Sequence, residues 1–405
     1  MTLDSPRLTW GKHIKKLKTD CLSRLQTLKA VSGTSWGADR KTLKIFYNSF
    51  VLSKLNYGSI LYESASKVLL KSLEVVHNLG LRIITGNRKT TPVDALLGET
   101  GMLPLKIKRQ KLTMDYFYNI QHYAHNFSIN INLERHLYRD HNGYSATVCI
   151  PFIGRAVCIA RKFGLDIGKT CPDQTMSPAP PWSRIYTNIH LNYNVQNITN
   201  SKISPFIAFD IRELILVRFP NYIEIYTDGS KTSDYVGAAI YIPSRSITVN
   251  WQLNAQHSIV AAELFAIKQA MQWIWEGYSS YEESSQFVIL SDSLSSLMII
   301  QKLSLTTYRQ LVTTIHSLML KLNSKGIIVA LQHVPAHCGV RGNEIVDAAA
   351  KMAYRNDKSA LLPIELADQK FHSKQATREQ FQEYWEIQRH GIYLGTIKDS
   401  VDNWP

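Results

Sequence analysis

Four acidic residues follow one another in the second half of the chain, each on a different kind of predicted element. Asp228 follows a run that alternates like a strand, in Tyr-Thr-Asp-Gly-Ser, and Asp292 follows the apolar run 287–291. Glu263 lies in a helical stretch, Ala-Ala-Glu-Leu-Phe-Ala-Ile, and Asp347 lies in another that contains three alanines. Acids at strand ends and on packed helix faces predict a paired divalent-cation site. The chemistry of such a site is phosphodiester hydrolysis.

Each acid taken singly also has an ordinary structural explanation. Asp228 begins a common turn sequence, Glu263 can face solvent, and Asp292 can cap the helix that follows it. Asp347 can pair with Lys351 four residues further along its helix. The position of all four acids at strand ends or packed helix faces favours one shared site over four unrelated roles.

A histidine-containing loop precedes the last of these acids. The sequence 333–344, His-Val-Pro-Ala-His-Cys-Gly-Val-Arg-Gly-Asn-Glu, holds two glycines and a proline, which predict a defined loop. His337 lies in this loop, ten residues before Asp347. A lone loop histidine is usually a solvated side chain. Beside a carboxylate cluster, its titration near neutral pH makes it a candidate proton shuttle.

The elements that must position these residues read as an α/β domain. The predicted strands are 222–227, 237–242, 247–253, 287–291 and 326–334, and the predicted helices are 258–275, 294–303, 308–323 and 343–354. A right-handed crossover through the first helix makes strand 287–291 the parallel neighbour of strand 222–227. Asp228 and Asp292 are then expected at the same edge of the sheet. Glu263 lies at the border of its helix's apolar face, where a buried carboxylate needs a partner.

The front of the chain is basic and helical. Of the formal net charge of +14, residues 1–112 hold +13, from 20 Lys and Arg against 7 Asp and Glu. Ile14, Leu17, Cys21, Leu25 and Leu28 recur at helical spacing, with lysines between them. Such a charge predicts that this region holds a polyanion, nucleic acid in particular. The alternative is a solvated basic helix surface.

Composition divides the 405 residues into four regions. Residues 1–139 are expected to form the basic helical region, and 140–218 a connector whose segment 176–182, Met-Ser-Pro-Ala-Pro-Pro-Trp, cannot be helical. The α/β domain is expected at 219–356, followed by a partly helical tail at 357–405.

The cysteines and the hydropathy pattern bear on the compartment. The five cysteines form no Cys-x-x-Cys pair, so neither a zinc ribbon nor a disulfide framework is predicted. No secretory segment and no run of about 18 apolar residues occurs. We expect a protein of a reducing compartment, in the nucleus or the cytoplasm, that does not engage a membrane.

Together these residues resemble a type 1 ribonuclease H. Its order of acids is matched by Asp228, Glu263, Asp292 and Asp347, with His337 in the loop before the last. Thr-Asp-Gly-Ser and the run His-x-Gly-x-x-Gly-Asn-Glu are specific motifs of that family. The resemblance covers about 221–355 and implies a five-stranded mixed sheet with flanking helices. The basic helical insertion of some members is absent, because 302–308 is too short to hold it.

The remaining sequence resembles the region that follows the polymerase palm in jockey-type non-LTR retrotransposon reverse transcriptases. The motifs are Leu-Thr-Trp-Gly-Lys-His-Ile (8–14), Ser-Gly-x-x-Trp-Gly (32–37), Leu-Asn-Tyr-Gly (55–58), Arg-Ile-Ile-Thr-Gly (82–86), Thr-Thr-Pro (90–92) and Glu-Thr-Gly-Met-Leu-Pro-Leu (99–105), with Trp385 and Trp404-Pro405 in the tail. This resemblance implies a thumb and connector before the nuclease. The chain contains no Tyr-x-Asp-Asp polymerase motif, so the resemblance implies a fragment that does not synthesise DNA.

The two resemblances imply a function and its cofactors. The four acids are expected to hold two Mg²⁺ ions, or Mn²⁺, for cleavage of RNA paired to DNA, while the basic region binds nucleic acid. Three alternatives are open: an inactive hybrid-binding remnant, a DDE transposase, and a polymerase fragment that works with a palm supplied by another chain.

Overall fold

The computed structural model describes residues 10–33, 35–123, 151–165, 167, 188–191, 205–277, 285–302, 307–355, 362–389 and 393–401. The predicted extended segment 176–182 and the terminal Trp404-Pro405 lie outside these residues. The chain divides into two compact units. One consists of Met1–Gly168 with Lys370–Pro405, and the other of Lys169–Gln369.

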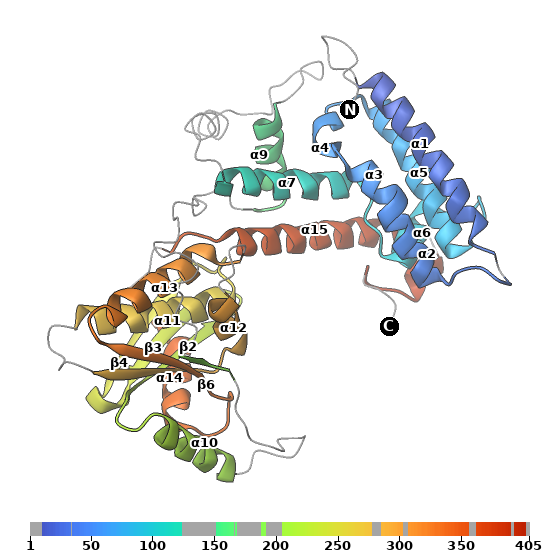
Figure 1. Cartoon of the computed structure of the whole chain (residues 1–405). Helices are drawn as coiled ribbons and strands as arrows, with labels where there is room; N and C mark the ends of the chain where they lie inside the picture. The colour runs from blue at the N-terminus through green and yellow to red at the C-terminus, as the bar shows by residue number, and fades with distance from the viewer. Residues whose placement is uncertain are drawn as a thin grey trace. The chain divides into compact units, whose positions relative to one another are not determined.

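The first unit is an array of helices (Figure 1). Its elements are α1 (Gly11–Ala30), α2 (Arg40–Tyr47), η1 (Asn48–Leu52), α3 (Ser53–Asn56), α4 (Ser59–Tyr62), α5 (Lys67–Thr85), α6 (Val93–Thr100), α7 (Leu105–Tyr123), α9 (Phe152–Lys162) and η7 (Tyr393–Thr396). The sequence predicted the buried face of α1, since the residues buried there are Ile14, Leu17, Cys21, Leu25 and Leu28. Asp39 caps α2, because its Oδ1 accepts a hydrogen bond from the Thr42 N–H at 3.2 Å.

The carboxyl-terminal tail is more regular than predicted. A single 24-residue helix, α15 (Leu366–Arg389), lies in the tail that was predicted to be partly helical. In the first unit, its Phe381 and Trp385 belong to the buried core. The Trp385 ring packs so closely on Gly98 that a Cβ on this glycine would overlap it. The length of α15 was not predicted, because most of its residues are polar and its narrow apolar stripe is weak in the sequence.

The second unit is built on a six-stranded sheet. The strands are β1 (Ile189–His190), β2 (Ile223–Lys231), β3 (Val236–Ile242), β4 (Ile247–Leu253), β5 (Gln286–Ser291) and β6 (Ile328–His333), in the order β1-β6-β5-β2-β3-β4. Five strands were predicted, and all five are present. The sixth, β1, pairs with β6 in parallel at the edge of the sheet. It comes from the segment predicted to be a connector, and two residues are too few to give a periodic pattern.

Helices cover both faces of this sheet (Figure 1). On one face lie α11 (Ile259–Glu276), α12 (Leu294–Lys302) and α13 (Arg309–Asn323), whose apolar residues share a core with Ile225 and Ile289. On the other face lie α10 (Pro205–Arg218) and α14 (Arg341–Lys351), which pack on Tyr226, Val288 and Leu290. Short 3-10 turns, η4 (Pro243–Arg245) and η6 (Ala353–Arg355), follow β3 and α14. Because the two faces of β5 are both covered, its run from Phe287 to Ser291 is fully buried.

The strand register decides which residues meet at the carboxyl edge. As predicted, β2 and β5 are parallel neighbours, and their last pair is Thr227 with Ser291. In each case the next residue is an aspartate, Asp228 within β2 and Asp292 directly after β5. The two aspartates are therefore neighbours at this edge.

Two further findings concern the described residues. None of their helices is long and apolar enough to cross a lipid bilayer. The three cysteines among them, Cys21, Cys158 and Cys338, are free thiols.

Candidate metal-binding active site

Three of the four predicted acids converge. One carboxylate oxygen each from Asp228, Glu263 and Asp292 lies within 4.8 Å of the others. They come from a central strand, from the helix that follows the β2–β4 hairpins, and from the turn after β5. Residues separated by up to 64 positions are thus gathered at one edge of the sheet, as expected for a site at the carboxyl ends of parallel strands.

The position of Asp228 differs in one respect from the prediction. The sequence placed it at the end of its strand, but β2 continues to Lys231. Asp228 is opposite Ala239 of β3, whereas the parallel pairing with β5 has already ended at Thr227. Asp228 is therefore held in the pairing of β2 with β3. On its other side β2 has no partner strand among the described residues at this position, and Asp292 lies there.

Glu263 reaches the cluster because α11 lies very close to β2. Gly229 makes this approach possible, since a Cβ on it would lie 2.7 Å from the backbone nitrogen of Glu263. The Glu263 side chain is 5 % exposed and shares a hydrogen bond with the Asp228 carboxyl. Its Oε2 atom is buried without any hydrogen-bond partner. Burying a carboxylate oxygen without a hydrogen-bond partner costs desolvation free energy, which a bound cation would offset.

Burial and mutual repulsion raise the pKa values of the three acids. For Asp228, burial is the larger cause and the charges of Asp292 and Asp347 add to it, so that its pKa rises to about 7. Burial, followed by the charges of Asp228 and Asp292, raises the pKa of Glu263 well above its usual value. Burial also raises the pKa of Asp292, although Asn343 and His337 act against it. Without a cation, the cluster therefore retains protons near neutral pH.

Asp347 lies beside the cluster but outside the group of three. Its negative charge raises the pKa of both Asp228 and Asp292, which shows that it faces them. Its Oδ2 atom accepts a hydrogen bond from Lys351 Nζ at 2.7 Å, the i,i+4 pair that the sequence offered as the ordinary explanation. Helix α14 packs closely on β3 where Ala350 meets Gly237. A Cβ on Gly237 would overlap the carbonyl oxygen of Ala350.

Around Asp292, one residue has a role that the sequence did not predict. Asn343 is buried in the first turn of α14 and its Nδ2 donates to Asp292 Oδ2 at 3.2 Å. This bond orients the carboxylate toward the other acids. The sequence did offer a signal, because Asn343 belongs to the Gly-Asn-Glu motif that ends the histidine loop. That motif was used only to identify the loop.

His337 lies in the loop that precedes α14. It is exposed, its φ of 53° puts it in the left-handed region, and its charge lowers the pKa of Asp292. The ring is thus near the acids while it stays in contact with solvent. The conformation costs free energy at a non-glycine residue, and the loop around it must stabilise that strain.

This donor set fits hard divalent cations. All the atoms involved are carboxylate oxygens, which Mg²⁺ and Mn²⁺ prefer. The partnerless Oε2 of Glu263 and the repulsion among the acids are both relieved by positive charge at this point. Asp228, Glu263 and Asp292 could hold a cation as they stand, and Asp347 could join them by exchanging Lys351 for it.

The region that holds the three acids matches a known protein family. Residues 220–355 match the family model of RNase H. This part of the chain holds five of the six strands, β2 to β6, with helices α11 to α14 around them in an RNase H-like fold. Among solved structures, the chain is similar to LC11-RNase H1, isolated from compost by a metagenomic approach. The identity is 18 % and the TM-score 0.27, over 33 % of this chain and 99 % of that one. A comparison with curated proteins found no match.

Proposed function

We propose that the second unit hydrolyses the RNA strand of RNA/DNA hybrids with divalent cations held by Asp228, Glu263, Asp292 and Asp347. The observation that carries the proposal is the meeting of two buried carboxylates and one half-buried carboxylate inside a region that matches the RNase H family. Structural carboxylates are seldom gathered in this way, because their repulsion destabilises the fold. Their juxtaposition is therefore expected to serve a ligand.

The chain's own residues prepare the site for that chemistry. The raised pKa values of Glu263 and Asp228 favour a protonated cluster in the free site, and a bound cation would favour the ionised carboxylates. Asn343 keeps Asp292 pointed into the cluster. Bound Mg²⁺ or Mn²⁺ would supply the positive charge that activates water and stabilises the leaving 3′ oxygen. His337, at the exposed rim, is suited to exchange a proton between the site and solvent.

The hybrid itself is recognised through its shape and its ribose hydroxyls under this proposal. We propose that the basic first unit adds phosphate contacts. Exposed Lys15 and Lys16 on α1 and the 74 % exposed ring of Trp36 support this, because nucleic acids bind through lysine–phosphate contacts and base stacking.

The test is cleavage of end-labelled substrates by the full chain in Mg²⁺, with RNA/DNA hybrid, DNA duplex and RNA duplex compared. We expect cuts only in the RNA of the hybrid, leaving 5′-phosphate and 3′-hydroxyl ends. The matched control is Asp228→Asn, which removes one charge at constant shape. Binding of the hybrid without cleavage by the unmodified chain would leave the inactive remnant as the function, and cleavage of DNA duplex would indicate the transposase class.

The sequence motifs outside the RNase H domain support a second proposal. We infer that the chain is part of a jockey-like retrotransposon reverse transcriptase, acting inside the nucleus or the cytoplasm. A neighbouring reading frame with a Tyr-x-Asp-Asp palm would support this origin. Polymerase activity on mixing such a palm with this chain would support action in trans.

A further inference from the structure

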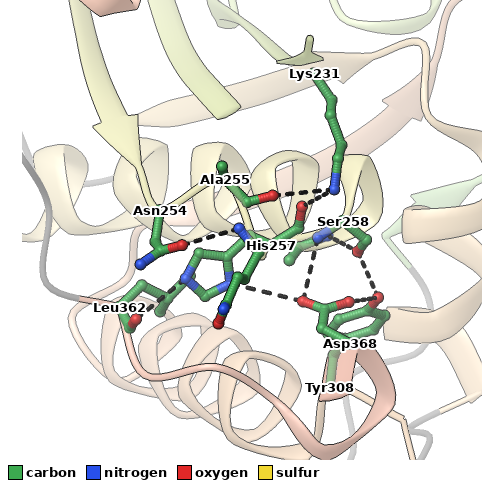
Figure 2. Close-up of polar contacts among 10 residues, drawn as sticks. Lys231, Asn254, Ala255, His257, Ser258, Tyr308, Leu362 and Asp368 are labelled. Carbon is green, nitrogen blue, oxygen red and sulfur yellow. Dashed lines mark hydrogen bonds and ion pairs between the residues drawn. The ribbon is translucent and has the colours of Figure 1, made fainter. Parts of the chain in front are cut away.

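A buried polar network lies at the amino terminus of the helix that carries Glu263 (Figure 2). Ser258 caps α11 by accepting a hydrogen bond from the Ala261 N–H at 3.1 Å. The Ser258 N–H in turn donates to Oδ2 of Asp368 at 3.2 Å. Asp368 belongs to the first turn of α15, beyond the end of the RNase H match at 355. The catalytic helix is thus anchored by a residue from outside the matched region.

The carboxylate of Asp368 is held by three groups. Besides the Ser258 N–H, Tyr308 OH donates to its Oδ1 at 2.7 Å. Nδ1 of His257 lies 3.6 Å from its Oδ2, slightly beyond a hydrogen bond. Burial by itself raises the pKa of Asp368, but the contacts with His257, Tyr308 and Ser258 outweigh it and hold that pKa below its usual value. Asp368 is therefore a charged, 1 % exposed group that contacts His257 and Ser258 at the start of α11 and Tyr308 at the start of α13.

Other contacts connect this network to β2 and to the chain after the match. Lys231, the last residue of β2, donates to the carbonyl of His257 at 2.6 Å and to that of Ala255 at 3.2 Å. His257 Nε2 lies 3.1 Å from the carbonyl oxygen of Leu362. The Leu362 side chain packs on the cluster that contains Ala262 and Phe265, the residues on either side of the Glu263–Leu264 pair.

The residue types resemble a nucleophilic triad, but they cannot act as one. His257 is fully buried, Asp368 is 1 % exposed, and the Ser258 oxygen is occupied by the Ala261 N–H and by Tyr308 OH at 2.5 Å. No substrate atom can reach these groups. The network instead sets where α11 begins, five residues or about 7.5 Å of helix before Glu263.

We propose that Asp368 is a positioning residue for Glu263, and that residues 362–369 are a working part of the nuclease although they lie beyond the RNase H match. The inference rests on the proposed function. Helix α11 packs directly on β2 at Gly229. A small shift of the amino terminus of α11 therefore moves the Glu263 carboxylate relative to Asp228. Precise carboxylate placement matters because cation binding falls steeply with lost geometry.

The test compares two variants of the full chain with a matched control. Asp368→Asn removes the charge at constant volume, and Tyr308→Phe is the milder change, removing one donor. Ile215→Ala is the control, because it opens a cavity in α10 on the other face of the sheet. Hydrogen exchange of segment 258–264 is measured in the metal-free protein, and Mn²⁺ affinity by calorimetry.

For Asp368→Asn we expect exchange in 258–264 to rise about fivefold or more while 269–276 is unchanged, and Mn²⁺ affinity to fall about tenfold. Tyr308→Phe should change hydrogen exchange and Mn²⁺ affinity in the same direction but by less. The double variant should change each quantity by less than the sum of the two single changes. Ile215→Ala should lower Tm without a local rise in exchange and without weaker Mn²⁺ binding.

The inference is overturned if Asp368→Asn lowers Tm but matches the unmodified chain in local exchange and Mn²⁺ affinity. Its failure differs from failure of the proposed function. An unmodified chain that binds Mn²⁺ and cuts no hybrid would refute hydrolysis alone. If the unmodified chain binds no Mn²⁺, unchanged exchange at 258–264 in Asp368→Asn still overturns the positioning role.

Discussion

At the scale of single residues, the three clustered acids destabilise the protein when no cation is bound. The carboxylates of Asp228, Glu263 and Asp292 lie close together. Burial and the repulsion between like charges both oppose their ionisation. Functional sites commonly carry such destabilising groups, and neutral replacements there raise stability while removing activity. This trade-off yields two predictions at the scale of single residues.

The first concerns stability in the absence of metal. Asp228→Asn should raise the free energy of unfolding at pH 8 by about 1–3 kcal/mol, because it removes one of the repelling buried charges. It should also abolish hybrid cleavage. Urea denaturation in EDTA measures the stability. Glu344→Gln, an exposed acid in the first turn of α14, is the control and should change little. A destabilised Asp228→Asn would contradict the account of repulsion.

The second concerns pH. Asp228 has a folded pKa of about 7, above its ordinary value of 3.8. A group with a raised folded pKa contributes stability that is complete below the unfolded pKa and is lost as pH rises through the folded pKa. The metal-free protein should therefore lose this contribution between about pH 4 and about pH 7.

The measurement for this pH prediction is the urea midpoint in EDTA, taken from pH 4 to pH 8 for the unmodified chain and Asp228→Asn. The difference in urea midpoint between the two proteins should grow with pH. It should become smaller again in saturating Mg²⁺, which would occupy the site. A difference that is constant over this range would show that Asp228 does not titrate with a raised pKa.

At the scale of elements, the contact of α11 with β2 is the most demanding. Gly229→Ala should destabilise the second unit by about 1–3 kcal/mol and reduce cleavage strongly. The reason is that the new Cβ would lie 2.7 Å from the Glu263 nitrogen and 2.9 Å from the Ala262 Cβ, so α11 must move away. Thermal denaturation and single-turnover cleavage give the two quantities.

Gly11→Ala serves as the control for this substitution. A Cβ at Gly11 would meet nothing within 4 Å, so stability and cleavage should stay near those of the unmodified chain. If Gly229→Ala behaved like Gly11→Ala, close packing of α11 could not be what places Glu263.

At the scale of the whole molecule, the charge is concentrated in one part of the chain. Residues 1–112 hold +13 of the formal +14. If they contact phosphates, the double variant Lys15→Ala/Lys16→Ala should weaken hybrid binding and lower the slope of log affinity against log salt by about 2. The turnover number should be unchanged, because neither residue belongs to the acid cluster.

The control for this prediction is Lys325→Ala, an exposed lysine just before β6, at the opposite end of that strand from Asp292. It should leave the salt slope close to that of the unmodified chain. Fluorescence anisotropy over a range of salt concentrations measures both variants. Equal slopes for all three proteins would remove phosphate binding from α1.

Local signals in the sequence were sufficient for most elements. The five long strands and the buried stripe of α1 follow from periodicity, which acts over a few residues. The sequence missed β1, α9 and α10, which lie in the predicted connector, and most of α15, which has a largely polar surface. Contacts with distant residues stabilise such elements, and short-range patterns do not encode these contacts.

The amino-acid sequence by itself determined which acids are available and on which strands and helices they lie. Only the tertiary structure decided that three of them meet while Asp347 is paired with Lys351, and that Asn343 and Asp368 orient their neighbours. The physical reason is distance. Periodicity reports which side of an element is buried, whereas the spacing of carboxylates depends on strand register and helix approach, to which residues far apart in the chain contribute together.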